Sequence, residues 1–469
     1  MVKIVVVGAG LGGLTAAALL AKAGHDVTVI EKNSWIGGKS RRIEVAGQRI
    51  DTGPSLVTFP AVLDELFSRY DSLGTPSDAA KVAGLKLERL PEVGKYYFRD
   101  EVVNLPVETD HKWHDAWQRF EAEHGHLGPQ IVKLLTADPF DAKTLPAVTA
   151  ITKNYGLRLS TSAYLKGLKW MPEGLREVIA IHTLNAGIAP QRTLALYATM
   201  PAVMANDGIF VPNGGVYEIA LALGRLATEA GAKILLNTEV TKIAKGSVKT
   251  AAGDFSADFV IGAADAQLVD SLIGRLARPA RRVSCSGVAI FAVLKKPLPA
   301  DTVTHSVIMP SSPEALHASL DKTLVPSETM AFLNYYKPGH VYPNSKATAA
   351  ILLTAPANGE VFTIDSEFVQ RELARISKLI GLKENLKDLI LDYKILDPSY
   401  FAEFGATGGA LYGATRPIWQ GGPFHSPGYS SISRPWLWRV GASVHPGGGI
   451  PAVIGGAMNS VARLLKKLN

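Results

Sequence analysis

The stretch KIVVVGAGLGGLTAAALLAKAGHDVTVIEK, near the start of this 469-residue chain, constrains the fold more than any other. The β-branched run from Lys3 to Val7 is typical of a buried parallel strand. An Ala/Leu-rich helix is expected from Leu14 to Lys22, with Gly24 as its stop and a second strand from Asp26 to Ile30. This order of strand, glycine turn, helix and strand predicts the α/β class with a Rossmann-like domain.

The glycines between the first strand and the helix have the spacing GxGxxG, at Gly8, Gly10 and Gly13. The first permits a tight turn, the second lets a pyrophosphate approach the backbone, and the third lets helix and strand pack closely. The helix N-terminus supplies N–H donors and a partial positive charge. Glu31, at the end of the second strand, is placed to accept hydrogen bonds from a ribose. The pattern therefore predicts a dinucleotide site.

A second glycine pair, Gly37-Gly38, follows in KNSWIGGKSRR and is flanked by Lys39 and Arg42. It suits a ligand whose diphosphate continues past the first loop, for which an ordinary NAD site has no obvious need. Solvated surface charges are the alternative interpretation of Lys39 and Arg42. The turn DTGP, from Asp51 to Pro54, then re-enters the core.

This N-terminal run resembles the FAD-binding start of the flavin amine oxidase and phytoene desaturase superfamily. The resemblance implies FAD, bound non-covalently, with the second glycine pair and the DTGPS-like turn near the flavin. Around Pro212 to Ala263 the chain again resembles that family, with a glycine pair before a helix, a strand, a short meander and a buried strand. A residue at the position of Val240 covers the FAD adenine in the family, and we expect Val240 to do so here.

The segment GASVHPGGGIPAVIGGAMNS, from Gly441 to Ser460, is a second glycine-rich loop that leads into a helix. A flavin is flat and apolar on both faces, and its polar groups need close backbone N–H donors and a helix dipole. With GGALYG at Gly408 to Gly413, this loop resembles bacterial-type carotenoid desaturases. Within that family it looks like the branch acting on hydroxylated or already desaturated carotenoids. Gly441-Ala442 stands where amine oxidases usually have Gly-Asp or Gly-Glu.

Motifs and resemblance together imply one set of cofactor-binding residues. They are Gly8, Gly10, Leu11, Gly12, Gly13, Glu31, Lys32, Gly37, Gly38, Lys39, Pro54, Ser55, Val240, Ala264, Gly441, Ala442, Gly449, Ile450 and Pro451. The candidate catalytic residue is His445, the one titratable group in the C-terminal loop, which could handle a proton or simply hydrogen-bond the loop or the flavin. No unambiguous catalytic base can be identified from the sequence.

The resemblance implies an FAD-dependent oxidoreductase that inserts double bonds into a carotenoid or similar isoprenoid polyene. An allylic hydride would go to flavin N5, and a base or water would remove the neighbouring proton. Quinone and oxygen are both possible electron acceptors. The alternatives are a flavin amine oxidase, a protoporphyrinogen-type oxidase, and a carotenoid isomerase or terminal oxidase on the same fold. A protein that escorts prenylated partners would not need the cofactor loops that this sequence keeps.

The chain length suggests two domains. We expect a discontinuous FAD-binding domain formed by residues 1–75, 205–275 and 425–469, with an inserted α+β substrate-binding domain formed by 76–204 and 276–424. Residues 76–204 are expected to be mainly helical, with His182, Trp113 and Trp117 in the core. The part from 150 to 200 contains NYGLRLSTSAYLKGLKWMPEGL, which reads either as a basic, aromatic helix at a membrane interface or as an ordinary surface helix.

Composition restricts the partners. The chain has a single cysteine, Cys285, so it forms no intrachain disulfide, and we expect no metal. Its formal charge of +7 comes from scattered Lys and Arg without a nucleic-acid motif, so nucleic acid is not expected. No membrane-spanning segment is expected either, since the uncharged run from Ile4 to Ala21 is explained by the glycine turn. A lipophilic polyene and positive charge favour a cytoplasmic protein bound peripherally to the inner face of a membrane.

Overall fold

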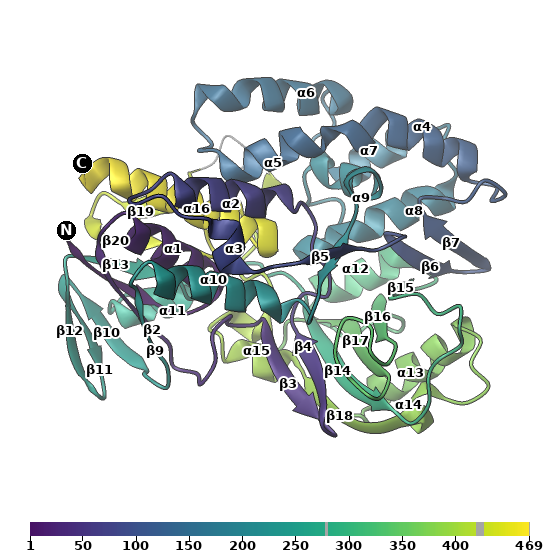
Figure 1. Cartoon of the computed structure of the whole chain (residues 1–469). Helices are drawn as coiled ribbons and strands as arrows, with labels where there is room; N and C mark the ends of the chain where they lie inside the picture. The colour runs from purple at the N-terminus through teal and green to yellow at the C-terminus, as the bar shows by residue number, and fades with distance from the viewer. Residues whose placement is uncertain (277–279, 419–425, 469) are drawn as a thin grey trace.

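The computed structural model describes residues 1–276, 280–418 and 426–468 (Figure 1). Its first sheet has the strand order β19-β20-β13-β1-β2-β9, and the pairings are parallel except between β19 and β20. The strands are β1 (Lys3–Val7), β2 (Asp26–Ile30), β9 (Lys233–Leu235), β13 (Phe259–Gly262), β19 (Ser430–Ser431) and β20 (Arg434–Arg439). Three distant parts of the sequence thus build one Rossmann-like sheet, which confirms the predicted fold class.

Helix α1 (Leu11–Lys22) packs between α10 (Tyr217–Glu229) and the C-terminal α16 (Ile450–Leu468), so the two ends of the chain lie together (Figure 1). Gly13 makes this packing possible, because an added Cβ would lie 2.1 Å from the carbonyl oxygen of Gly8. The predicted meander is also present, as β10 (Val240–Ala244), β11 (Gly246–Thr250) and β12 (Gly253–Ala257).

A second sheet has the order β18-β14-β17-β16-β15-β6-β7, antiparallel except between β15 and β6. Its strands are β6 (Gly94–Phe98), β7 (Glu101–Leu105), β14 (Ser286–Leu294), β15 (His305–Ile308), β16 (Ala331–Tyr336), β17 (Thr348–Ala355) and β18 (Ile390–Leu396). One face packs on α13 (Glu367–Leu379) in a continuous apolar core. The opposite face points toward the helical segment and carries much of the cavity described below.

The helical segment contains α4 (His114–His124), α5 (Gly128–Thr136), α6 (Leu145–Tyr155), α7 (Thr161–Gly167), α8 (Glu173–Ile181) and α9 (Met200–Asp207). Elsewhere the helices are α2 (Ala61–Asp71), α3 (Ala79–Ala83), α11 (Ala266–Leu272), α12 (Pro313–Asp321), α14 (Leu386–Leu389) and α15 (Pro398–Ala402). Two short antiparallel pairs complete the fold: the hairpin of β3 (Arg41–Val45) with β4 (Gln48–Thr52), and β5 (Leu87–Arg89) with the distant β8 (Phe210–Pro212).

Residues 76–204 are mainly helical, as expected, although β5, β6 and β7 also lie within them and the last two join the second sheet. The expectation for the basic aromatic stretch needs correction, because it is not one amphipathic helix: α6 ends at Tyr155 and is followed by Gly156, which has φ +56°. Tyr155 and Tyr164 are buried, with the Tyr164 hydroxyl 2.7 Å from Nε2 of His124.

Among the described residues, no helix combines the length and the apolar character required to cross a lipid bilayer. Trp113 and Trp117 are buried as expected, and so is Cys285, whose thiol pKa burial raises to about 12. The division into two domains stays a prediction, and its boundary at 424–425 lies outside the described residues.

Candidate functional site

A cavity of about 850 Å³ lies at the carboxyl ends of β1, β2, β13 and β20 and extends over the second sheet. Its volume is in the upper part of the usual range for ligand sites, about 300–1,000 Å³. Gly8, Glu31, Ala263 and Gly441, which follow the four strands, all line it. This crevice outside the carboxyl ends of parallel strands is where α/β sheets bind ligands.

The N-terminal glycine turn leaves backbone open to the cavity. Gly8 has φ +107°, and a Cβ added to Gly10 would meet no atom within 4 Å. The second glycine pair is fastened to this turn, because the N–H of Gly37 donates to the carbonyl oxygen of Ala9 at 2.7 Å. The two glycine segments therefore form one continuous strip of accessible backbone.

Glu31 is buried at the end of β2. Its Oε2 accepts from the N–H of Ala9 at 2.8 Å, and its Oε1 accepts from the N–H of Asn33 at 2.9 Å. These bonds hold the carboxylate against the glycine turn. Oε1 also accepts from the side-chain amide of Asn33 at 2.8 Å, so the acceptor capacity that remains for a ribose hydroxyl is that of Oε2.

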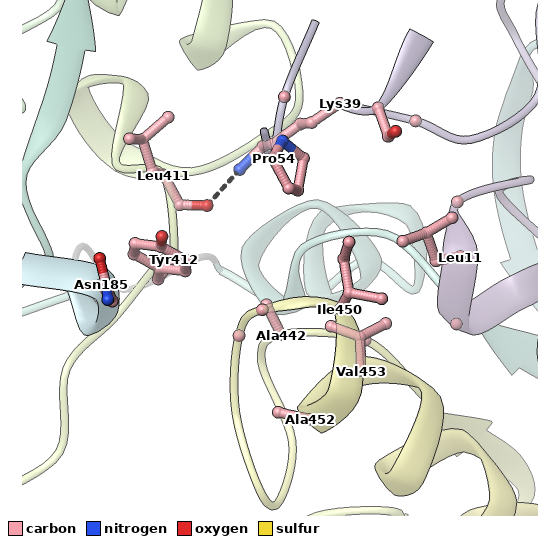
Figure 2. Close-up of a pocket in the computed structure, with 18 of the residues that line it drawn as sticks. Leu11, Lys39, Pro54, Asn185, Leu411, Tyr412, Ala442, Ile450, Ala452 and Val453 are labelled. Carbon is pink, nitrogen blue, oxygen red and sulfur yellow. Dashed lines mark hydrogen bonds between the residues drawn. The ribbon is translucent and has the colours of Figure 1, made fainter. Parts of the chain in front are cut away.

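The C-terminal glycine loop closes the same crevice from the other side. A Cβ on Gly12 would lie 3.1 Å from the backbone nitrogen of Gly441, so the two glycine segments are in direct contact. Helix α16 begins at Ile450 and directs its N-terminus toward the cavity, as Leu11, Ala442 and Ile450 show in Figure 2. Helix N-termini favour negative charge and electron-rich groups.

Lys39 reaches across the cavity, where its Nζ donates to the carbonyl oxygen of Leu411 at 2.7 Å (Figure 2). Burial lowers the pKa of Lys39 to about 8, although the nearby Asp265 carboxylate opposes this. At neutral pH the ammonium group is therefore charged but poorly solvated, and a bound diphosphate would stabilise it.

Arg42 was expected, together with Lys39, either to bind a diphosphate or to be a solvated surface charge, and it does neither. Its guanidinium lies 2.8 Å from Asp51 and 3.1 Å from Glu218, in ion pairs that tie the β3–β4 hairpin to α10. Arg42 is not among the residues that line the cavity, and its side chain is mostly buried. It is a structural residue, neither a solvated charge nor a ligand of the diphosphate.

The structure brings nearly all the predicted cofactor residues to one surface. Those lining the cavity are Gly8, Gly10, Leu11, Gly12, Glu31, Lys32, Gly37, Gly38, Lys39, Pro54, Ser55, Val240, Ala264, Gly441, Ala442, Gly449, Ile450 and Pro451. Gly13 lies behind them, where it serves the packing of α1 on β1. His445 also lines the cavity with a buried side chain, and the backbone N–H of His445 donates to the carbonyl oxygen of Pro427.

Sequence reasoning missed a group of polar side chains in the same cavity. They are Tyr96, His182, Asn185, Tyr197, Asp265, His305, Asn334 and Tyr412. Tyr412 lies inside the GGALYG motif, and Asp265 directly follows a predicted site residue, so both had a signal in the sequence. His182 is buried as expected, but it borders the cavity as well as the core.

The residues present fit FAD. The space above Gly10, which a Cβ would occupy, gives a diphosphate access to backbone N–H groups. Glu31 stands at the ribose position, and the α16 N-terminus is available at the other end of the glycine strip. Within the described residues, no three His, Cys, Asp or Glu side chains gather where they could hold a metal ion.

Known proteins with similar sequences match the whole chain. A phytoene desaturase of Fusarium fujikuroi is 25% identical over 99% of this chain and 89% of its own length. A 4,4'-diapophytoene desaturase of Staphylococcus haemolyticus is 24% identical over 99% of both chains. Among solved structures, putrescine oxidase bound to putrescine matches with a TM-score of 0.65 and 16% identity, over 100% of this chain and 98% of that one. The structural likeness supports the fold.

The model of one protein family matches residues 11–395, from the start of α1 into β18 of the second sheet. The matched region includes Glu31, the second glycine pair and the strands of the cavity floor, whereas β1 and the C-terminal glycine loop lie outside it. The chain belongs to the family of flavin containing amine oxidoreductases.

Proposed function

We propose that this protein is an FAD-dependent desaturase that introduces double bonds into a carotenoid or similar long isoprenoid polyene. The observation that carries the proposal is the continuity of one cavity, which joins a glycine-lined dinucleotide site to an apolar floor. Relatives named as phytoene and diapophytoene desaturases, similar over their full length, support the choice of substrate class.

The floor consists of neighbouring residues on one face of the second sheet. Val307, Phe332, Leu352 and Ala289 stand side by side across β15, β16, β17 and β14, and all line the cavity. Such a row offers a long, flat, apolar surface that excludes water and holds an extended hydrocarbon in one register. In our proposal it decides which carbons of the polyene lie next to the cofactor.

FAD, when bound, supplies the two-electron acceptor that accompanies loss of a hydride and a proton from the polyene. The chain's contribution is to bind and orient both molecules and to receive the proton. His445 is our candidate for holding that proton, because it lines the cavity within the C-terminal glycine loop.

An amine oxidase reaction is less well supported. An amine substrate is a cation, which a carboxylate beside it would stabilise. The floor row next to the one described above consists of His305, Asn334, Ala350 and Phe291, so neither row carries a carboxylate. The features of the floor favour an uncharged substrate.

We further propose that the polyene enters from a lipid surface at α6. Phe140, Leu145, Leu157 and Leu159, here called the α6 surface, are 64%, 61%, 98% and 64% exposed. Their chain neighbours Pro139 and Thr144 line the cavity. The exposed basic residues of this part of the chain are Lys143, Lys153 and Arg158. Exposed apolar groups beside positive charge are typical of peripheral attachment to anionic membranes.

The test is the absorption spectrum of the purified protein, followed by anaerobic incubation with carotenoid-loaded liposomes. We expect an oxidised-flavin spectrum that bleaches while the polyene bands shift to longer wavelength. Bound flavin that responds to amines and not to carotenoids would overturn the proposal in favour of an amine oxidase. A protein that cannot be reconstituted with FAD would overturn it altogether.

A further inference from the structure

Four polar side chains interrupt the apolar floor at one place. Tyr96 of β6 and His182 form a hydrogen bond of 2.9 Å between the tyrosine hydroxyl and Nε2. His305 of β15 and Asn334 of β16 stand opposite each other, with Nδ1 of the histidine 2.7 Å from the amide oxygen. All four line the cavity, and we call them the polar patch.

The patch is enclosed, yet its hydrogen-bonding capacity is not exhausted. His182 is 7% exposed and His305 is 8% exposed, so water reaches them only through the cavity. Nδ1 of His182 and Nε2 of His305 make no hydrogen bond to any described residue, and neither atom is fully buried, so both are open to a ligand or water in the cavity. Polar atoms in so enclosed a site usually bind a ligand or an ordered water.

The fold makes room for this arrangement. A Cβ on Gly94 would lie 3.0 Å from Cδ2 of His305, so the glycine at the start of β6 leaves space for the imidazole. Tyr96 pairs with Val307 and therefore lies on the same face of the sheet, next to the His305 row. Three of the four residues, Tyr96, His305 and Asn334, thus belong to the sheet at a fixed register relative to the apolar row, and His182 joins them from the end of α8.

Both imidazoles are neutral at physiological pH. Burial lowers the pKa of His182 to about 3, and the neighbouring His305 contributes to the lowering. Burial also lowers the pKa of His305 to about 4, although its hydrogen bond to Asn334 acts in the opposite direction. Neutral imidazole and phenol groups donate to and accept from hydroxyl and carbonyl oxygens, but they do not neutralise a carboxylate.

We propose that the polar patch binds an uncharged oxygen atom, a hydroxyl or a carbonyl, at one end of the polyene, which makes an oxygenated polyene the preferred substrate over a hydrocarbon. The inference rests on the proposed desaturase function, whose floor it shares. The oxygen anchors one end of the chain, and the anchor sets which bond reaches the cofactor.

The experiment compares three probes of the same polyene length: the hydrocarbon, its terminal alcohol and its terminal ketone. Two quantities are measured with the FAD-loaded protein: equilibrium binding, and kcat/KM for anaerobic flavin reduction. We expect wild type to prefer at least one oxygenated probe by about tenfold or more in both, because an enclosed polar site rejects analogues that leave it unpaired. Comparison of the alcohol with the ketone shows whether the polar patch prefers a hydroxyl or a carbonyl oxygen.

The variants are Tyr96→Phe and His305→Leu, each expected to reduce the ratio of kcat/KM and of affinity between oxygenated and hydrocarbon probes toward unity. The matched control is Ser306→Ala, which changes the next residue of the same strand on the opposite face. The buried Ser306 hydroxyl has no partner among the described residues, so its removal should change neither preference nor stability. Tyr96→Phe removes a single oxygen and keeps the inference testable if His305→Leu does not fold.

The outcomes separate the two proposals. Equal binding and turnover of all three probes by wild type would overturn the polar patch and leave the desaturase function standing. Preferred binding of an oxygenated probe without flavin reduction would support the patch and overturn the function. A preference that survives in both Tyr96→Phe and His305→Leu would overturn the assignment to these residues.

Discussion

The Nζ of Lys39 donates to the carbonyl oxygen of Leu411 at 2.7 Å, a bond that joins the second glycine segment to the GGALYG motif. Both residues line the cavity, and Figure 2 shows the Lys39 side chain directed toward Leu411. The ammonium group is therefore held by a neutral carbonyl in a site that we expect to receive the anionic cofactor.

The first prediction concerns the pH dependence of FAD binding. With the pKa of Lys39 lowered by burial to about 8 in the free protein, a bound diphosphate should raise it again. Protonated Lys39 then favours binding, so FAD affinity should be constant below pH 8 and fall by up to about tenfold per pH unit above it. Titration of the apoprotein with FAD at a series of pH values measures this. Lys39→Met should flatten the curve, whereas the remote, exposed Lys249→Met should not; parallel curves for all three proteins would contradict the prediction.

The second prediction concerns how Lys39 makes the stability of the apoprotein depend on pH. From about pH 8 to the ordinary lysine value of 10.5, the unfolded chain carries a proton at Lys39 that the folded protein does not. The free energy of unfolding should therefore rise with pH across this window, relative to Lys39→Met. Below pH 8 the difference between the two proteins should be constant. Urea unfolding of both apoproteins at several pH values measures this slope, and a solvated lysine, whose pKa would be the same in the folded and unfolded chain, would give none.

A pair of glycine substitutions should separate cofactor binding from folding. Gly13→Ala places a methyl group 2.1 Å from the carbonyl oxygen of Gly8, so the apoprotein should lose about 1–3 kcal/mol of stability or more. Gly10→Ala meets no protein atom and has an ordinary φ of −67°, so its apoprotein should be destabilised by no more than about 1 kcal/mol. Its FAD affinity should nevertheless fall at least tenfold. Comparable FAD affinity in Gly10→Ala and wild type would show that the ligand does not approach this backbone.

For His445 we expect a kinetic defect. If its imidazole receives the proton, His445→Gln should slow substrate-driven flavin reduction by about 10²–10⁴-fold with unchanged flavin content. Stopped-flow absorbance under anaerobic conditions measures the step directly. Loss of flavin affinity with an unchanged reduction rate in the reconstituted enzyme would instead assign the residue to the loop or to the flavin.

The α6 surface should control membrane binding. Replacing Leu157 and Leu159 together by Ser removes two exposed apolar side chains, each worth up to about 1.5–3 kcal/mol when buried in lipid. Flotation with anionic vesicles should then fall at least tenfold. The matched control replaces Leu324 and Val361 by Ser, which are 57% and 71% exposed outside the α6 region. An equal loss in both variants, or none in either, would locate the contact elsewhere.

The N-terminal part of the site could be predicted because its structure is local. A β-branched run, three spaced glycines and an acidic residue specify strand, turn, helix and ribose site within a short stretch of chain. The strand limits at Lys3, Val7, Asp26 and Ile30 agree with the prediction. Helix α1 begins earlier than expected, at Leu11, because tertiary packing outweighs the low helix propensity of Gly12 and Gly13.

The polar patch could not be predicted because it depends on strand register. His305 and Asn334 meet only through the pairing of β15 with β16, and Tyr96 comes from a segment that was expected to be helical. Arg42 illustrates the same limit, since its partner Glu218 belongs to a distant helix. Residue spacing along the chain contains no information on such contacts.

The contact between Gly12 and Gly441 also sets a time order for biosynthesis. The first glycine turn emerges from the ribosome first, and the loop that completes the crevice follows only after the long stretch between Gly12 and Gly441 has been made. At about 5–20 residues per second, tens of seconds separate the two halves of the site. A chain interrupted before residue 441 would carry the complete dinucleotide fingerprint and still lack one wall of the cavity, so cofactor uptake reports on chains synthesised past this loop.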